Sequence, residues 1–198
     1  MKTKVFQYKG KGLRTEPITQ QFIDLYKKVF AGAPYFEEYE DDWIYEFVWQ
    51  YHLLKGCIVL ASDEKDVLVG ISCAIGLDKV SLTVTDGSKD PLYQAKSFLL
   101  ENSLFDVGRT VYMSEIAVLP EFRGQGIGTR LIFKRWLWGV SQNYLYYAMR
   151  TAAKNSNSYK IYERLGAESL AVIQDVSDYA QTIKSASDQR IYLYGTLS

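Results

Sequence analysis

The sequence predicts an α/β (α+β) fold in which helices flank one mixed central sheet. Short β-rich apolar segments alternate with segments whose apolar residues recur at helical spacing, and this mixture continues along all 198 residues. Two helical segments precede the first predicted hairpin, and the later helices stand between strands. Because no internal repeat and no linker rich in Pro, Gly or Ser divides the chain, we expect a single domain over residues 1–198.

The first half of the chain is expected to form a strand, two helices and a β-hairpin. Pro34 and Gly56 lie where the two helices are expected to end, and the turn Asp63–Asp66 joins the hairpin strands. The predicted elements are, in order, the strand Lys4–Tyr8, the helix Ile18–Phe30, a second helix that Asp41 or Asp42 caps and that runs to about Leu54, and the strands Cys57–Ser62 and Val67–Ile75.

The second half is expected to alternate strands and helices after a less regular stretch over residues 77–108. In that stretch Val80–Val84 is a candidate strand, and Pro91–Asn102 is a predicted helix with Asp90 as its cap. The elements that follow are the strand Thr110–Leu119, the helix Gly128–Val140, the strand Tyr144–Met149, the helix Asn155–Leu165 and the strand Arg190–Tyr194.

Composition excludes several classes of protein. Hydrophobic residues make up 47% and charged residues 23%, a globular balance that excludes disorder. The 23 Lys and Arg equal the 23 Asp and Glu, which argues against a nucleic-acid binder. The N-terminus has no apolar signal-peptide core and no apolar run is long enough to span a bilayer, so we expect a cytoplasmic protein without membrane contact.

The cysteines and the single histidine indicate no metal site and no hydrolase triad. Two Cys cannot form a disulfide framework. Cys57, Cys73 and His52 lack the spacing of a zinc site, so both cysteines are expected to be packing residues. No Gly-x-Ser-x-Gly elbow accompanies the histidine.

The most informative segment runs from Ser114 to Thr129 and joins a strand to a helix through a glycine-rich loop. Its glycines are Gly124, Gly126 and Gly128. Glycines let backbone N–H groups converge at a helix N-terminus, where they bind phosphate oxygens. Thr129 adds a hydroxyl donor and Arg123 a positive charge. The Rossmann pattern fails because Thr129 stands where glycine is needed, and the Walker Gly-Lys-Ser/Thr is absent.

Two motifs carry a family resemblance. Arg123, Gly126 and Gly128 match the pattern Arg/Gln-x-x-Gly-x-Gly/Ala, and about thirty residues later Asn155 begins a second motif that ends Tyr-x-x-Leu-Gly at Tyr162 to Gly166. Position 158 is Ser where the second motif usually has Ala. In these motifs, over roughly residues 110–167, the chain resembles the GNAT superfamily of acyl-CoA-dependent N-acetyltransferases.

This resemblance implies an acetyl-CoA site where the strands 110–119 and 144–149 splay apart. Pantetheine amides would pair with the first of these strands, and the pyrophosphate would lie on the glycine loop. Asn155 would hold the pantetheine or position the next helix, while simple capping of that helix is the alternative. The implied cofactor residues are Ile116, Ala117, Val118, Arg123, Gly124, Gln125, Gly126, Ile127, Gly128, Thr129 and Asn155.

The resemblance also implies direct attack by a primary amine on the thioester, with an acid for the leaving thiolate and a base for the amine. Tyr162 matches the family acid, although a core-facing role is the alternative. Glu115 is the only acid in its strand but has the wrong alternation for a base, unless a bulge resets the facing. Ser114 acting through water, or Glu38, are the rival bases.

The acceptor is expected to be an amine of a small molecule or peptide. The loop after the first helix offers aromatic and carboxylate side chains for an ammonium group, from Tyr35, Glu38 and Trp43. Residues 29–54 hold six acids and no Lys or Arg, whereas residues 120–164 hold eight basic residues and two acids. This division suits a cationic acceptor and an anionic cofactor, although solvated faces would give the same pattern.

Two points of the functional prediction stay open. A non-catalytic acyl-CoA sensor with the same fold is the alternative to an enzyme. The helix Gly128–Val140 is apolar around much of its circumference, so it either lies in the core, the favoured interpretation, or packs against a second copy in a homodimer. Its large apolar residues are Phe133, Trp136, Leu137, Trp138 and Val140.

Overall fold

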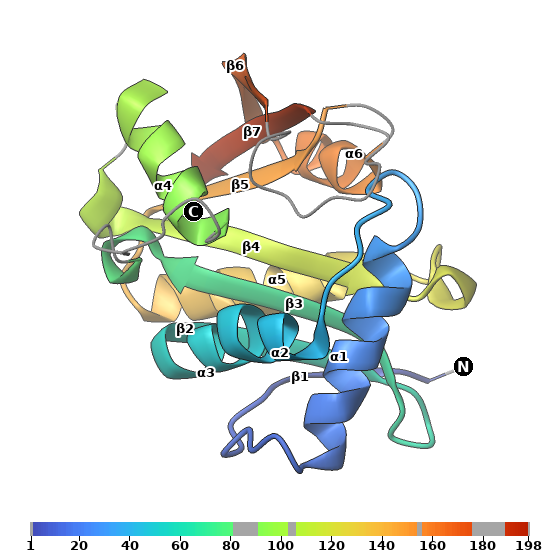
Figure 1. Ribbon diagram of the computed structural model, residues 1–198. Helices are drawn as coiled ribbons and strands as arrows, with labels where there is room; N and C mark the ends of the chain where they lie inside the picture. The colour runs from blue at the N-terminus through green and yellow to red at the C-terminus, as the bar shows by residue number, and fades with distance from the viewer. Residues whose placement is uncertain (1, 81–90, 103–105, 154–155, 176–188, 198) are drawn as a thin grey trace.

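The computed structural model describes residues 2–80, 91–102, 106–153, 156–175 and 189–197. Within these residues the centre of the fold is one seven-stranded sheet of order β1-β2-β3-β4-β5-β7-β6 (Figure 1). All neighbours are antiparallel except β4 and β5, which are parallel. The strands are β1 (Lys4–Gln7), β2 (Gly56–Ser62), β3 (Leu68–Gly76), β4 (Thr110–Val118), β5 (Tyr146–Ala152), β6 (Glu168–Asp175) and β7 (Gln189–Thr196).

Helices cover both faces of the sheet, which confirms the predicted mixed sheet flanked by helices. In Figure 1, α1, α2 and α3 lie in front of the sheet and α5 lies behind it. The helices are α1 (Pro17–Phe30), α2 (Asp41–Trp43), the π-helix η1 (Ile44–Gln50), α3 (Tyr51–Lys55), α4 (Pro91–Asn102), α5 (Ile127–Ser141) and α6 (Asn157–Arg164). Short 3₁₀ turns are η2 (Leu77–Lys79), η4 (Val107–Arg109) and η5 (Pro120–Phe122).

The two faces of the sheet hold separate apolar clusters. On the front face, Phe22 of α1 and Trp49 of η1 pack with Ile71 of β3. On the rear face, Leu131 of α5 and Tyr162 of α6 pack together. A third cluster lies under α4, where Leu92, Ala95 and Leu99 meet Tyr112, Ala148 and Tyr192 of the sheet. The central strands are therefore buried on both faces, as their nearly unbroken apolar sequences predict.

The predicted elements agree with the structure apart from a few boundaries and one strand. The strand not predicted is β6, an edge strand in which Val172 and Ile173 are both exposed and no alternation marks a buried face. Glu40, not Asp41 or Asp42, is the cap of α2. Residues 81–84 of the candidate strand at Val80–Val84, and the cap Asp90, lie outside the described residues.

The parallel strands β4 and β5 part soon after they begin, as expected. Their ladder contains only Thr110–Tyr112 paired with Tyr146–Ala148, although both strands continue beyond it. This divergence is the predicted splay, and the glycine loop follows directly at the end of β4. Among the described residues, no helix combines the length and the apolar composition that crossing a bilayer requires.

The outer face of α5 corrects the prediction that this helix is mostly core. Leu137 is 65% exposed, and Phe133 and Val140 are also exposed. The buried stripe instead consists of Ile127, Leu131, Ile132, Arg135 and Gly139. A charged residue thus occupies a core position while large apolar side chains face outward.

Candidate active site

The glycine loop forms an open turn at the N-terminus of α5. Gly124 has φ +77° and Gly126, the helix N-cap, has φ +73°, a backbone region that residues with a Cβ adopt at a cost. A Cβ built at either position would meet nothing within 4 Å, so open space lies above the loop. Gln125 is exposed, whereas the side chain of Ile127 is buried in the rear cluster and anchors the turn.

The N–H groups of residues 127–129 stand at the first turn of α5, where a helix has no internal partner for them. Together with the helix dipole they favour an anion in the open space above the loop. Gly128 and Thr129 are half-buried in this turn. Arg123 donates from Nε to the Val118 carbonyl at 3.0 Å, which fixes the end of β4 against the loop.

The register of β4 shows which backbone groups are available beside the loop. Leu119 N–H donates to Val69 C=O at 3.0 Å, and hydrogen-bonding residues alternate along an antiparallel pair. Ala117, two residues earlier, therefore turns its N–H and C=O toward β3. Ile116 and Val118 turn theirs to the other side, toward the region that β5 has left. A second extended chain can pair there.

A bulge interrupts β4 between Tyr112 and Glu115, whereas the pairing from Glu115 to Val118 is unbroken, so the bulge does not reset the facing of Glu115 relative to Val118. Between Cys73 and Ile75 of β3 the register moves from Glu115 to Tyr112, so β4 has one residue more than its partner. Met113 and Ile116 consequently both pack into the rear cluster although three positions separate them. Glu115 faces the front, where Tyr26 Oη of α1 lies 3.4 Å from its Oε2.

Glu115 lies in an environment that suits a base near neutral pH. Burial raises the pKa of its carboxyl to about 7. The Arg150 cation lowers this pKa, and the charge of Glu37 raises it by a smaller amount. The carboxyl is therefore near its titration midpoint at neutral pH, the condition in which proton transfer to and from it is most effective.

Ser114, the rival to Glu115, is engaged elsewhere. Its Oγ lies 2.6 Å from Nε2 of His52, whose Nδ1 lies 2.7 Å from the Val48 carbonyl. Because a carbonyl only accepts, Nδ1 carries the proton and Nε2 accepts from the serine hydroxyl. Burial lowers the pKa of His52 to about 4, so this imidazole stays neutral and is a weak proton acceptor.

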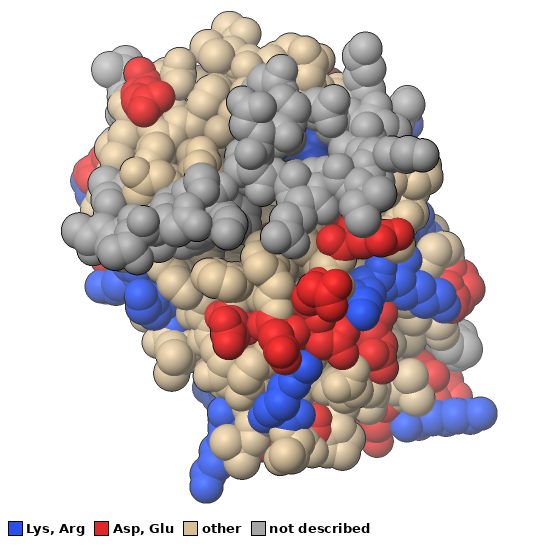
Figure 2. Space-filling model, viewed as in Figure 1, with Lys and Arg blue, Asp and Glu red and all other residues tan. Residues whose placement is uncertain are grey.

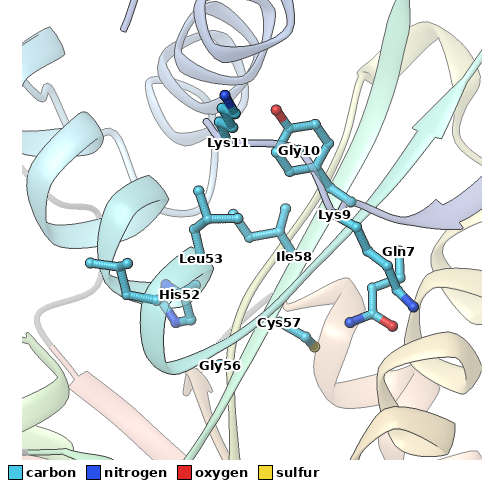
Figure 3. A pocket seen from close by; sticks show the side chains of 11 residues that line it. Gln7, Lys9, Gly10, Lys11, His52, Leu53, Gly56, Cys57 and Ile58 are labelled. Atoms are coloured by element: carbon cyan, nitrogen blue, oxygen red, sulfur yellow. The ribbon is translucent and has the colours of Figure 1, made fainter. Parts of the chain in front are cut away.

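A cavity of about 380 Å³ lies on the far side of His52, between residues 7–11 and α3 (Figure 3). Cys57 lines it, and burial raises the pKa of that thiol to about 12, which keeps the thiol protonated. The register aligns the start of β2 with the start of β4, so the cavity and the glycine loop lie at opposite ends of the sheet. Both cysteines are buried and free, as packing residues are.

Tyr162, the predicted acid, approaches the same bulge from the rear face. Its side chain is fully buried, with its ring centroid 5.8 Å from that of Tyr147. Burial raises the pKa of the phenol, while the charge of Arg135 acts in the opposite direction. The hydroxyl accepts a hydrogen bond from Arg135 Nη2. The phenol is thus protonated at neutral pH, as an acid requires.

Arg135 was not identified as a site residue from the sequence. Its Nη1 donates to the carbonyls of Glu115 at 2.7 Å and Cys73 at 3.0 Å, the residues that adjoin the bulge. A single guanidinium therefore links α5, the bulge and the Tyr162 hydroxyl. The detectable signal was an arginine four residues after Leu131, on the apolar stripe of the helix.

The acceptor loop is tied to the sheet rather than free. Tyr35 Oη lies 3.3 Å from Thr151 Oγ1 of β5. Glu37 forms a buried ion pair with Arg190 of β7 at 2.7 Å. Of the predicted substrate residues, Glu38 is exposed, and Trp43 stacks on Tyr39 with a centroid distance of 4.6 Å. These contacts tie the loop to β5 and β7.

Acidic side chains gather on the front of the molecule (Figure 2). Part of this charge is already paired, because Asp41 contacts Lys27 at 2.7 Å and Asp42 contacts Arg14 at 3.1 Å. Glu38 and Glu40 are exposed.

Asn155 lies outside the described residues, and the cap of α6 is Ser156, whose hydroxyl accepts from Tyr159 N–H at 3.2 Å.

Parted parallel strands, a glycine turn at a helix N-terminus and a buried tyrosine behind the parting define the acetyltransferase class of fold. The sequence profile of the acetyltransferase (GNAT) family matches residues 20–167. The chain therefore belongs to the acetyltransferase (GNAT) family.

Individual relatives are similar over part of the sequence or in fold alone. The thialysine N-epsilon-acetyltransferase of Mus musculus is 35% identical over 63 residues, which cover 32% of this chain and 37% of that protein. The chain thus matches little more than a third of this curated relative. The structure of a mosquito arylalkylamine N-acetyltransferase like 5b has TM-score 0.68 and 14% identity, covering 98% of this chain and all of that one. A Staphylococcus aureus GNAT acetyltransferase has TM-score 0.66 and 14% identity over both complete chains.

Proposed function

We propose that this chain is an N-acetyltransferase that moves an acetyl group from acetyl-CoA to a primary amine by direct attack. The observation that carries the proposal is the β4 bulge. Beyond it Glu115 lies on the front face, opposite to Met113, while Tyr162 reaches the same point from the rear through Arg135. A base and an acid thus stand on opposite sides of the strand edge at which an acyl donor would pair.

The residues around the splay fit coenzyme A. The open space above Gly124 and Gly126 suits a pyrophosphate held by the N–H groups of the loop and of the first turn of α5. Ile116 and Val118 would offer backbone groups to the pantetheine amides, and Val118 N–H would polarise a carbonyl oxygen of the bound thioester. When bound, acetyl-CoA supplies a thioester whose carbonyl carbon an amine can attack.

Glu115 is assigned the base. A free alkylamine has a pKa of about 10.4, so at neutral pH almost all of it is protonated and unreactive. A carboxylate with a pKa of about 7 can take that proton once the ammonium group is desolvated against it. The hydroxyl of Tyr26 and the ring of Tyr35 adjoin this face, where aromatic surface favours a cation.

Tyr162 is assigned the acid. Its buried phenol is protonated, and it can give its proton to the departing sulfur. The substrate class that we propose is a primary alkylamine, since the curated relative named above is a thialysine N-epsilon-acetyltransferase. The exposed acids Glu38 and Glu40 would attract such a cation to the loop.

Thiol release from acetyl-CoA in the presence of an amine panel tests the proposal. The panel contains thialysine, lysine, a polyamine, an arylalkylamine and a peptide with a free N-terminus, and binding of CoA is followed separately by thermal shift. We expect CoA to raise the melting temperature and at least one amine to release thiol at a rate above background. Binding of CoA without thiol release for any amine would instead support the non-catalytic sensor.

A further inference from the structure

Arg135 is a buried cation whose partners are all neutral. Its side chain is 0% exposed, and its hydrogen bonds go to two backbone carbonyls and one phenol. Among the described residues, no carboxylate forms an ion pair with it, and its Nε is buried without a hydrogen-bond partner. A buried charge that lacks an ionised partner is costly and is retained where it serves a purpose.

The position of the Arg135 guanidinium determines the hydrogen-bonding role of the Tyr162 hydroxyl. Arginine only donates, so the bond from Nη2 occupies a lone pair of the phenol oxygen and leaves the phenolic hydrogen unused. The guanidinium carbon lies 5.8 Å from the centre of the Tyr162 ring, close enough to stabilise a negative charge on the phenol oxygen. The other terminal nitrogen is held by the carbonyls of Cys73 and Glu115, which fixes the side chain in this orientation.

We propose that Arg135 is a positioning residue for the acid of this site. It holds the oxygen of Tyr162 as an acceptor, directs the phenolic proton away from itself toward the leaving sulfur, and stabilises the phenolate that remains. This inference rests on the proposed function, because it assigns Arg135 to the step in which Tyr162 acts.

The amine nitrogen forms a bond to the carbonyl carbon, the carbon–sulfur bond breaks, and its electron pair stays on sulfur. The amine enters this step neutral, after its ammonium proton has passed through Glu115 to solvent. Tyr162 gives its phenolic proton to that sulfur, and the ionised Glu115 receives the proton that the amine nitrogen loses as the amide forms. The phenolate remains beside Arg135 until solvent returns a proton after the products leave.

A double-mutant cycle on kcat tests whether Arg135 acts through Tyr162. We expect Arg135→Met and Tyr162→Phe each to lower kcat by about 10²-fold, with the KM for acetyl-CoA changed by less than about threefold. Because both changes remove the same acid, the double variant should be no slower than the worse single variant. Lys134→Met, an exposed cation next to Arg135 on α5, is the matched control and should keep the parent kcat.

A second measurement needs no cofactor. A fluorinated tyrosine at position 162 brings the phenol titration into the pH range in which the protein is folded, and fluorine NMR follows it. Among the described residues, the ionisable groups that contact Tyr162 are Arg135 of α5 and Tyr147 of β5. Loss of Arg135 should make the phenol at least about tenfold less acidic, and Arg135→Lys, which keeps the charge, should restore part of that acidity.

The outcomes separate the two proposals. The role of Arg135 is overturned if the kcat losses of the two single variants multiply in the double variant, or if Arg135→Met leaves the titration of the Tyr162 phenol unchanged. In either case, thiol release by the parent still supports the proposed function. A parent that releases no thiol overturns both. Where Arg135→Met does not fold, Arg135→Gln, which is neutral but keeps a donor for the carbonyls, replaces it in the cycle and in the titration, and the same two results decide.

Discussion

At the scale of single residues, the surroundings of Glu115 beside the β4 bulge determine the pKa of its carboxyl. Alternation counted from Met113 would turn its side chain toward the rear cluster, and the extra residue between Tyr112 and Glu115 turns it to the front, the face of Ala117. Partial burial there raises its pKa to about 7, whereas the pairing of exposed Glu121 with Lys28 lowers the pKa of that carboxyl. Two acids six residues apart thus differ in pKa because of their surroundings alone.

Glu115→Gln should lower kcat by about 10²-fold at pH 8 and by less at pH 6. The parent needs the ionised carboxylate, so its rate should rise with pH through about 7, and the variant should lose this rise. A pH profile of kcat between pH 5.5 and 9 measures both, with Glu163→Gln on exposed α6 surface as control. A variant whose profile matches that of the parent would remove Glu115 from the role of base.

At the scale of elements, the glycine loop combines strain with open space. Gly126 and Gly166 both have φ above +70°, and a Cβ at either would meet nothing within 4 Å. Alanine at either position should therefore cost about 1 kcal/mol or somewhat more of folding stability for the same reason. The two positions differ in that only Gly126 stands at the N-terminus of α5.

Gly126→Ala should weaken CoA binding by about tenfold or more, because its methyl group enters the space assigned to the pyrophosphate. Gly166→Ala should lose similar stability and keep the parent affinity. Isothermal titration with CoA, alongside urea unfolding of both variants, makes the comparison. Equal affinities for CoA in the two variants would place the pyrophosphate elsewhere.

The sequence predicted most elements, and it predicted the glycine loop with its residues, because both depend on local patterns. Helical spacing identified α1 and α5, and turn residues identified the hairpin of β2 and β3. What it missed depends on contacts distant in sequence. The edge strand β6 is defined by β7, and the buried position of Arg135 is defined by carbonyls of β3 and β4. The bulge between Tyr112 and Glu115 was not predicted, since no residue type marks it, and it does not change the alternation between Glu115 and Val118.

At the scale of the whole molecule, one ion pair joins segments far apart in the sequence. Glu37 of the acceptor loop and Arg190 of β7 are 153 residues apart and lie 2.7 Å from each other. Lys27 and Asp41 form a pair of the same length, but their side chains are 45% and 38% exposed, against 6% and 10% for Arg190 and Glu37. Burial, not distance, separates the two pairs energetically.

Arg190→Met should destabilise the protein by roughly 3–5 kcal/mol, because it leaves the Glu37 carboxylate buried without its partner. Lys27→Met, the exposed counterpart, should cause little measurable change. Adding Glu37→Leu to Arg190→Met should recover part of the loss, since no unpaired charge then remains. Urea unfolding of the four proteins gives these differences, and equal losses for Arg190→Met and Lys27→Met would contradict the argument.

Two groups on the front face of the sheet give the molecule opposing dependences of stability on pH. Glu115 binds its proton more tightly in the folded state, so it lowers stability as pH rises from about 4.5 to about 7. His52 binds its proton less tightly in the folded state, so it lowers stability as pH falls from about 6.5 to about 4. Between these limits their contributions partly cancel.

Glu115→Gln should therefore match the parent in stability near pH 4 and exceed it by roughly 1–3 kcal/mol at pH 8, where the parent holds an ionised carboxylate in a partly buried place. His52→Gln should lose a constant amount through its two hydrogen bonds but no longer weaken between pH 6.5 and pH 4. Urea unfolding at several pH values separates the two effects. A Glu115→Gln variant no more stable than the parent at pH 8 would show that the carboxyl titrates normally, and the placement that makes it a base at neutral pH would then be wrong. If Glu115→Gln is more stable than the parent at pH 8, then one feature, the partly buried position of Glu115 beside the bulge, both lowers the stability of the parent at pH 8 and raises the pKa that suits Glu115 to act as a base.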